Sequence, residues 1–555
     1  MARKFPIGIQ TFSKIRQDNA IYVDKTALVY KLANEGQVYF LARPRRFGKS
    51  LLISTLDDYF SGRKELFSGL AIESLETEWK KHPVLRFDFS RMKFQRPGDL
   101  DELLDIQLKE FESLYGIHGQ LAQSCKEKLK NSSRLQNLIL AAEQQTGQQV
   151  VFLADEYDAP LLDTLVDKAS FESMRQTLRD FYSPLKSLDA HLRFIFITGI
   201  TKLSLHVIPA SERESPFFGI PDQVGYDTGW AGLNHLSDIS MLDEYATLCG
   251  ISEEELHTQM KPEIEAMAAA TGKTFEQVCD GLKRKYDGYH FSIKSPDIYN
   301  PFSLMNSLQK KELTNYWFET GTPIHLIEQI KKFNINPEEI AKGIEATADM
   351  FNIPAESSAN PMPVLYQSGY LTIKGFRPRG SVYRLAIPNE EVREGMFKNL
   401  LPHYAGIEKS KSDTFIIRFT DAIYDGKLDD AMEMLRAFLS SIPYDAEQQD
   451  EDHYKTIFYL LFRMCSPFVT ETEARSAAGR ADAVVETNDA VYVFEFNLDK
   501  AATVEEAIKQ IDDKGYLIPY TVKKMDNGTP KKLFKIGAII DSDKRTLGEW
   551  KMVEG

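Results

Sequence analysis

The stretch Tyr39-Phe-Leu-Ala-Arg-Pro-Arg-Arg-Phe-Gly48-Lys49-Ser50-Leu51-Leu52 joins a short apolar run, a basic loop and the start of an apolar helical pattern. This order is typical of the strand, loop and helix of a phosphate-binding P-loop. In such loops, backbone N–H groups at the helix N-terminus face an anion, a lysine reaches the β- and γ-phosphates, and a hydroxyl ligates Mg²⁺. The spacing assigns the last two roles to Lys49 and Ser50, which follow Gly48.

One position departs from the pattern G-x-x-x-x-G-K-[ST], because Arg43 stands where the first glycine is expected. The loop must then turn without a glycine's freedom to adopt positive φ at that residue, and Pro44 is expected to stiffen it. Arg45 and Arg46 add positive charge together with Arg43, and we expect Arg45 and Arg46 to contribute to binding of the phosphates. A solvated basic turn would carry the same residues, so the assignment depends on acidic residues further along the chain.

Length and composition limit the classes of protein to consider. A chain of 555 residues is too long for one core and predicts about three or four domains. Its net charge of −14 argues against a protein coated with nucleic acid, although a local basic groove stays compatible with it. The four cysteines have no C-x-x-C spacing, which favours neither a zinc site nor a disulfide scaffold.

The sequence also predicts where the protein works. The first twenty residues lack the apolar core of a signal peptide, and no apolar run approaches the roughly 18 residues of a membrane span. We therefore expect a cytoplasmic protein with no membrane partner, and the sequence leaves a homo-oligomer open.

Strand-like and helix-like patterns alternate in the first 200 residues. Val84-Leu-Arg-Phe-Asp-Phe89 alternates like a strand, and residues 149–154 and 191–199 read as buried strands. A helical pattern over residues 135–145, which is stopped by Gly147, lies between the first and the second of these strands. The expected fold class is therefore α/β, with a mostly parallel sheet wrapped by helices.

An apolar strand that ends in Asp155-Glu156 follows the P-loop by about a hundred residues. In P-loop ATPases with an added strand, such an Asp supports Mg²⁺ through water and the Glu polarises the attacking water. We therefore predict that Asp155 helps to hold the metal and that Glu156 is the catalytic base. Thr198, at the end of the next strand, could sense the γ-phosphate, although Thr is also simply a good strand residue.

Several motifs spread over nearly the whole chain resemble the AAA-ATPase-like family of prokaryotic proteins that carry a C-terminal PD-(D/E)XK nuclease-like domain. The motifs are Arg43-Pro-Arg-Arg-Phe-Gly-Lys-Ser50, Ala154-Asp-Glu-Tyr-Asp-Ala-Pro160, Phe196-Ile-Thr-Gly-Ile-Thr201, Tyr286-Asp-Gly-Tyr-His-Phe291, Tyr299-Asn-Pro-Phe-Ser303, Tyr316-Trp-Phe-Glu-Thr-Gly-Thr-Pro323 and Gln367-Ser-Gly-Tyr-Leu371. The resemblance implies ATP and Mg²⁺ as cofactors, a restriction-endonuclease-like C-terminal fold, and DNA or RNA as a partner.

The resemblance and the patterns together predict four regions. These are an ATPase-like domain (1–235), a helical lid (236–350), a winged-helix-like region (351–410) and a nuclease-like domain (411–555). The winged-helix-like region lacks a dense basic helix, which favours an interaction or packing role over DNA binding. An insertion at residues 210–230 could cover the nucleotide or a partner site, or could simply pack on the surface.

Two strands near the C-terminus, residues 480–486 and 491–497, flank a short polar loop. A symmetric loop would place Asp482 opposite Glu495, and directly opposed residues share one face with Cβ atoms ~4.5–5.5 Å apart. Opposed like charges destabilise a sheet unless something compensates, and a divalent cation such as Mg²⁺ or Mn²⁺ would do so. In the resembled nuclease superfamily, Asp482 and Glu495 match the metal-holding acids of the motif D…(D/E)-x-K.

The expected lysine of that motif is replaced by Asn497, which cannot carry the positive charge that stabilises a developing phosphorane. Arg480, opposite Asn497, or Lys514, on the flank of the following helix, could supply a charge instead. We therefore predict an ATPase joined to a nuclease-like domain whose residues Asp482, Glu495 and Asn497 form the second catalytic constellation. The alternative is a nucleotide-controlled switch whose C-terminal domain is catalytically silent.

Overall fold

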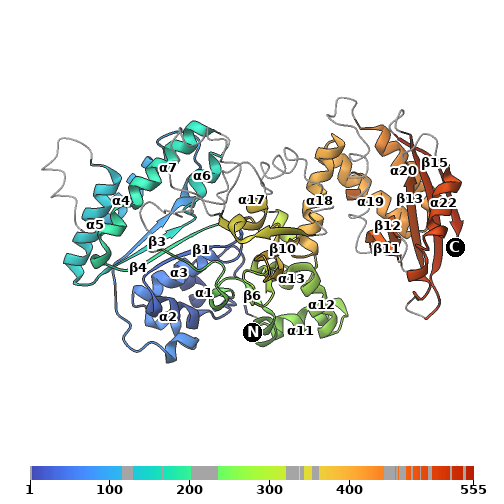
Figure 1. Cartoon of the computed structure of the whole chain (residues 1–555). Helices are drawn as coiled ribbons and strands as arrows, with labels where there is room; N and C mark the ends of the chain where they lie inside the picture. The colour runs from blue at the N-terminus through green and yellow to red at the C-terminus, as the bar shows by residue number, and fades with distance from the viewer. Residues whose placement is uncertain are drawn as a thin grey trace. The chain divides into compact units, whose positions relative to one another are not determined.

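A computed structural model of the chain, shown in Figure 1, separates into two compact units. Unit 1 comprises residues 1–322 and 343–391, and unit 2 comprises residues 323–342 and 392–555. The described residues are 3–115, 129–165, 167–201, 236–319, 337, 340, 343–352, 362–442, 457, 460–461, 471–476, 479–487, 489–497, 503–525, 528–541 and 546–555. The insertion at 210–230 lies outside them.

A five-stranded parallel sheet forms the centre of the first part of unit 1, in the order β2-β3-β4-β1-β5. Its strands are β1 (Val38–Ala42), β2 (Val84–Asp88), β3 (Val150–Asp155), β4 (Leu192–Gly199) and β5 (Ser237–Asp238). Strand β4 lies between β1, which precedes the P-loop, and β3, which ends in the predicted acids. Strand β4 is thus the added strand expected from the sequence. Because the strands are parallel, their carboxyl ends lie at the same edge of the sheet, which brings the P-loop and the predicted acids together.

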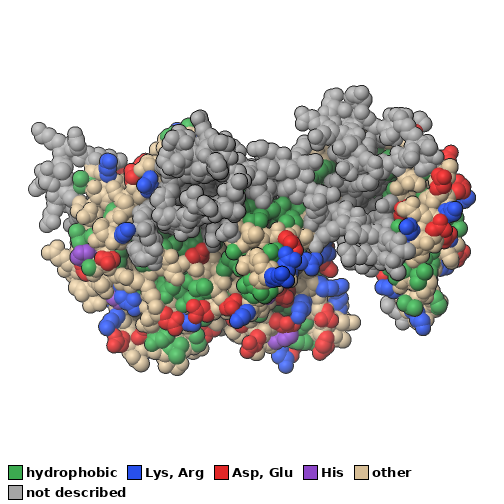
Figure 2. Space-filling model, viewed as in Figure 1, with side chains coloured by type: hydrophobic (Ala, Val, Ile, Leu, Met, Phe, Trp, Pro, Cys, Tyr) green, Lys and Arg blue, Asp and Glu red, His purple; other side chains and the backbone are tan. Residues whose placement is uncertain are grey.

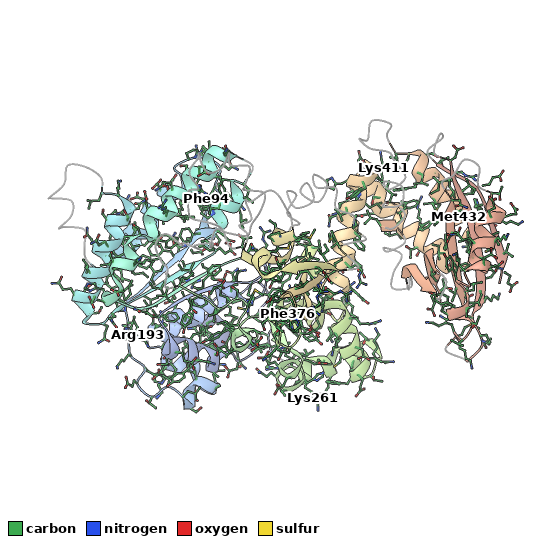
Figure 3. The ribbon with its side chains drawn as sticks, in the orientation of Figure 1. Phe94, Arg193, Lys261, Phe376, Lys411 and Met432 are labelled. Carbon is green, nitrogen blue, oxygen red and sulfur yellow. The ribbon has the colours of Figure 1, made fainter. Side chains whose placement is uncertain are left out.

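Helices cover both faces of this sheet, as Figure 1 shows. They are α1 (Phe12–Gln17), α2 (Thr26–Glu35), α3 (Lys49–Phe60), α4 (Asp99–Leu114), α5 (Asn131–Thr146), α6 (Ala159–Asp163), α7 (Lys168–Tyr182) and α8 (Pro184–Ser187). Apolar residues of α4, α5 and α7 pack with β2 and β3 into one core, which includes Phe94, labelled in Figure 3. Helix α5 ends at Gly147 in a left-handed conformation, as predicted.

The middle of unit 1 is mainly helical. Its elements are β6 (Ile251–Ser252), α10 (Glu253–Gln259), α11 (Lys261–Thr271), α12 (Phe275–Tyr286), β7 (Ile298–Tyr299), α13 (Pro301–Lys310) and α14 (Tyr316–Glu319). Strands β6 and β7 pair antiparallel, and the helices share a core with residues of the N-terminal segment, including Ile21. Helices α10 and α12 begin with capping boxes, at Ser252 and Thr274.

A small antiparallel sheet, in the order β8-β10-β9, completes unit 1. It consists of β8 (Ile344–Thr347), β9 (Thr372–Arg377) and β10 (Val382–Ala386), with α17 (Met362–Gln367) before β9. Phe376 of β9, labelled in Figure 3, packs against Tyr383 of β10 with ring centroids 4.8 Å apart and the ring planes tilted by 53°. The sequence predicted the last two strands and did not identify β8, which lies in the stretch expected to be mostly helical.

Unit 2 is built on a five-stranded sheet in the order β11-β12-β13-β14-β15, in which β13 and β14 are parallel. Its elements include α19 (Lys409–Tyr424), α20 (Leu428–Ser440), β11 (Glu471–Ser476), β12 (Gly479–Glu486), β13 (Ala490–Asn497), α22 (Val504–Asp513), β14 (Lys532–Asp541) and β15 (Thr546–Glu554). The preceding helix α18 (Glu390–Ala405) begins in unit 1. Helix α22 is the crossover between the two parallel strands and packs on both of them.

The α/β class, the helical middle and the C-terminal sheet domain are therefore confirmed, whereas the four region boundaries remain predictions. Gly426, with φ 68°, turns the chain between α19 and α20. The sequence also indicates a polar acidic linker at residues 445–452, which lie outside the described residues. Among the helices that the structure describes, none has the length and apolar character needed to cross a membrane.

Candidate functional site

The loop between β1 and α3 turns through two left-handed residues, Arg46 (φ 68°) and Gly48 (φ 92°). A Cβ atom on Gly48 would meet no atom within 4 Å, so its backbone angle, not crowding, makes glycine the fitting residue. Arg43 has no positive φ, so the loop does not need a glycine at that position. Helix α3 begins directly after the turn, at Lys49.

Arg43 does not add its charge to the loop, contrary to the prediction. Its side chain is buried, with only 1% of the residue exposed. The guanidinium donates hydrogen bonds to the carbonyl oxygens of Ser240 (2.7 Å) and Tyr245 (3.2 Å) and lies 4.2 Å from the ring centre of Phe291. Burial lowers the pKa of this guanidinium. Arg43 therefore ties the P-loop to the segments that follow β5 and α12.

The Lys49 side chain points back under the loop and is 6% exposed. Its ammonium donates hydrogen bonds to the carbonyl oxygens of Arg43 (2.9 Å) and Pro44 (3.0 Å). Burial lowers the Lys49 pKa, and the nearby charges of Glu156 and Asp158 oppose that shift. A buried cation surrounded by carbonyl oxygens and carboxylates can hold the oxygens of a phosphate group.

The two predicted acids lie where β3 ends. Asp155 is 2% exposed, and its Oδ1 atom has no hydrogen-bond partner among the described residues. Burial raises the Asp155 pKa, while a hydrogen bond from the Ser50 hydroxyl and the charge of Lys49 lower it. Ser50 and Asp155 thus bring two oxygen-bearing side chains together that could hold Mg²⁺, an ion that prefers oxygen ligands.

Glu156 is in a left-handed conformation (φ 51°), which costs a non-glycine residue of order 1–3 kcal/mol and is enriched at active sites. Burial raises the Glu156 pKa, and the charge of Lys49 opposes that rise. A carboxylate with a raised pKa accepts a proton more readily, which suits a general base.

Thr198 is completely buried at the end of β4, next to Leu41 of β1. Its hydroxyl donates a hydrogen bond to the carbonyl oxygen of Leu41, at 2.9 Å. The hydroxyl therefore ties β4 to β1 in this structure, and the role of a γ-phosphate sensor stays a prediction. Arg45 and Arg46 are exposed on the loop, and the Arg46 guanidinium lies 5.0 Å from the ring centre of Phe302.

Asp158 is a residue of this site that the sequence reasoning missed. It is 1% exposed, and its Oδ2 atom accepts hydrogen bonds from the backbone N–H groups of Ile200 and Thr201 and from the Thr201 hydroxyl. Its Oδ1 atom has no partner in the described part of the chain. The sequence does show an Asp at the start of α6, a position where capping residues are common. Its hydrogen-bond partners, however, lie more than forty residues later in the chain.

Asp88 is a second missed residue. It ends β2, and the parallel register places it beside Asp155. Its Oδ1 atom accepts hydrogen bonds from the backbone N–H (2.9 Å) and hydroxyl (2.6 Å) of Ser90, and its charge raises the pKa of Asp155. The alternating pattern that ends at residue 89 could have indicated this position.

A cleft of about 460 Å³ lies over these groups. Gly48, Lys49, Ser50, Glu156 and Asp158 are among the residues that line it. This volume is within the range of small-molecule sites in proteins, about 300–1,000 Å³. The structure thus brings the predicted loop and acids to one cleft of suitable size.

The C-terminal hairpin has the register that the sequence predicted. Ala483 pairs with Phe494 and Glu486 with Val491, and the same register continued by one residue sets Asp482 opposite Glu495. The side chains of residues 471–483, including Arg480 and Asp482, lie outside the described part of the structure. The approach of the two carboxylates therefore stays a prediction.

Glu495 is 4% exposed on β13, and the Gln510 side-chain amide of α22 donates a hydrogen bond to its Oε1 atom. Helix α22 starts with a capping box between Thr503 and Glu506. Asn497, half-buried, lies beside Ile539 of β14. Among the described residues, no group of three His, Cys, Asp or Glu side chains could hold a metal ion, and Asp482 is not among those residues.

Comparisons with known proteins agree with this arrangement. A family model described as a predicted AAA-ATPase matches residues 6–208, and a model of the PD-(D/E)XK nuclease superfamily matches residues 449–550. The chain is 33% identical over 560 residues to an uncharacterized protein in the vnfD 5' region of Azotobacter chroococcum mcd 1, covering 98% of both chains. No solved structure matches the chain.

Proposed function

Because this chain belongs to the family of predicted AAA-ATPases that carry a C-terminal PD-(D/E)XK nuclease superfamily domain, we propose that it binds Mg²⁺-ATP and hydrolyses it. The observation that carries this proposal is the buried Lys49 ammonium, held at the start of α3 within the field of Glu156 and Asp158. A lysine so placed would exchange loop carbonyl oxygens for phosphate oxygens when the nucleotide enters.

The remaining groups have roles that follow from their positions. Ser50 and Asp155 would hold Mg²⁺, which when bound offsets charge on the phosphates. Glu156, whose pKa is raised by burial, would orient a water molecule and take its proton. Asp158 holds the backbone of Ile200 and Thr201, and so keeps the end of β4 against the acidic segment.

For the C-terminal domain, the proposal is a metal site at Asp482 and Glu495 that acts on or near nucleic acid, with Mg²⁺ or Mn²⁺. Support comes from the confirmed hairpin register and from the match to the nuclease superfamily. Figure 2 shows basic and acidic side chains interspersed on the described part of the C-terminal unit, so this proposal does not rest on a basic patch there.

A second function is favoured by two observations in the same domain. Asn497 stands at the lysine position, and the Gln510 amide occupies the Oε1 atom of Glu495. Both would weaken metal-dependent cleavage, so the second candidate is a nucleotide-controlled switch whose nuclease-like domain binds a partner without cutting it.

Two assays on the purified full chain test these proposals. Phosphate release from ATP should require Mg²⁺ and stop with a chelator, and ATP hydrolysis that persists without a divalent cation would contradict the roles of Ser50 and Asp155. Incubation of single- and double-stranded DNA and RNA with Mg²⁺ or Mn²⁺ separates the two candidates. Cleavage that needs Glu495 supports the nuclease, and binding without cleavage supports the switch.

A further inference from the structure

Three sequence motifs outside the candidate nucleotide site pack against its P-loop. Their described residues are 286–291, 316–318 and 367–371, and none of these lines the cleft. From the first motif, Tyr289 and Phe291 make T-shaped ring contacts with Phe47 of the loop, with ring centroids 4.8 Å and 5.2 Å apart. The motif thus contacts the loop without taking part in the cleft.

The other two motifs contact the backbone side of the loop. The indole N–H of Trp317 donates a hydrogen bond to the Arg45 carbonyl oxygen, at 3.3 Å. Gly369 lies so close to Pro44 that a Cβ atom on the glycine would be 2.6 Å from the Pro44 Cβ atom. Tyr370, the next residue, packs on the Trp317 ring with ring centroids 5.2 Å apart. A movement of the loop backbone at Pro44 or Arg45 would therefore displace Trp317 and its neighbours.

Trp317 also binds the first turn of α18. Its backbone N–H donates a hydrogen bond to the Oε1 atom of Glu391, at 2.8 Å. Glu391 is 1% exposed, is the second residue of α18 and is the last residue of unit 1. Burial raises the pKa of this carboxyl group to about 7, and the hydrogen bond from Trp317 opposes the rise. Because a buried carboxyl group that loses a donor is costly, the start of α18 should follow a displacement of Trp317.

The loop backbone next to Arg45 has a physical reason to change when a phosphate group binds. The Lys49 ammonium donates hydrogen bonds to the carbonyl oxygens of Arg43 and Pro44. If Lys49 turned to phosphate oxygens, both carbonyl groups would lose this donor, and the backbone of residues 43–45 would adjust. Coupling between two sites needs an element with two arrangements that both sites bias. The loop supplies that element, and the contacts from Arg45 through Trp317 to Glu391 connect it to α18.

We propose that Trp317 couples the P-loop to α18, so that binding of Mg²⁺-ATP alters the hold on the helix that continues into unit 2. The inference rests on the proposed nucleotide binding at Lys49, and it adds the route by which a nucleotide would control the C-terminal domain. Trp317 is a positioning residue in this role, because it contacts the loop backbone and α18 and does not line the cleft.

Hydrogen–deuterium exchange in peptides that cover α18 tests this coupling on the full chain, with and without Mg²⁺-ATP at a concentration that saturates each protein in calorimetric titration. In the wild type, Mg²⁺-ATP should change this exchange by about fivefold or more, the lower end of typical coupling strengths. Trp317→Phe removes the indole N–H, keeps an aromatic ring against Tyr370, and should abolish the change. Trp79→Phe is the matched control and should keep it, because Trp79 packs on Tyr59 and Phe67 and its indole N–H has no partner among the described residues.

Glu391 provides a second pair of variants. Glu391→Gln keeps an oxygen that can accept the Trp317 N–H and should keep the nucleotide-dependent change, whereas Glu391→Ala should lose it. If Glu391→Ala fails to fold, Trp317→Phe decides alone.

Three outcomes would overturn the inference while the nucleotide site stands. They are unchanged exchange in the saturated wild type, an equal change in Trp317→Phe, and loss of the change in Trp79→Phe as well. A wild type that does not bind Mg²⁺-ATP would overturn the proposed function, and the inference with it.

Discussion

Replacing Arg43 by glycine would restore the usual P-loop pattern, yet the structure predicts that it destabilises the protein. The guanidinium is the partner of the Ser240 and Tyr245 carbonyl oxygens and lies over the Phe291 ring. Each buried acceptor left without a partner costs about 1–3 kcal/mol, and a desolvated cation–ring contact contributes about 2 kcal/mol. The cost of burying the guanidinium, visible in its lowered pKa, offsets part of this sum.

The net expectation for Arg43→Gly is a loss of roughly 3 kcal/mol in local stability, which corresponds to an equilibrium constant for local opening, and hence amide exchange, about 150-fold larger. Hydrogen–deuterium exchange in peptides that cover β1 measures this directly, without assuming that the two units unfold together. Arg43→Lys keeps a charge but not the planar fork of donors, and should fall between glycine and the wild type.

Arg45→Gly is the matched control, because Arg45 is exposed on the same loop. It should leave exchange in β1 unchanged. If exchange in β1 is as slow in Arg43→Gly as in the wild type, then the guanidinium does not hold the loop, and the reasoning is refuted.

Three further predictions concern catalysis and pH. Glu156→Gln should keep nucleotide binding but slow hydrolysis by ~10²-fold or more, the scale of a lost general base, and wild-type rates in a single-turnover assay would show that another residue positions the water. Burial raises the Asp287 pKa from 3.8 to about 7, so the folded state binds the proton more tightly and loses stability as pH rises from about 4 to about 7. Asp287→Asn should flatten that part of the profile in urea unfolding at successive pH values, and an unchanged profile would exclude Asp287 as its source. Asn497→Lys should raise Mg²⁺- or Mn²⁺-dependent cleavage by up to ~10²–10³-fold, and added Asp482→Ala should abolish the gain, whereas strong cleavage by the wild type would contradict a silent site.

Features set by neighbouring residues were predictable from the sequence. The capping box at Thr503 and the stop at Gly147 involve residues within one helical turn. The register of the β12–β13 hairpin follows from its short symmetric loop, and the P-loop from its spacing. In each case the partners lie close along the chain, so pattern and geometry suffice.

Features set by distant partners were not predictable in this way. Arg43 finds its carbonyl acceptors 197 and 202 residues later, and a single sequence shows nothing that links them. Strand β8 is four residues long and exists because it pairs with β10, nearly forty residues on. Residues 6–10 line the cleft beside the P-loop, and Arg3 just before them is held by Gln259 of α10 and Glu263 of α11, more than 250 residues later in the chain.

The central claim is that Lys49 binds the phosphates of a Mg²⁺-nucleotide, and calorimetric titration of Mg²⁺-ATP into the wild type and Lys49→Ala tests it most directly. Loss of one charge-assisted contact predicts binding weaker by roughly tenfold to 100-fold in the variant. Equal affinities in the two proteins would contradict the P-loop assignment and the function built on it.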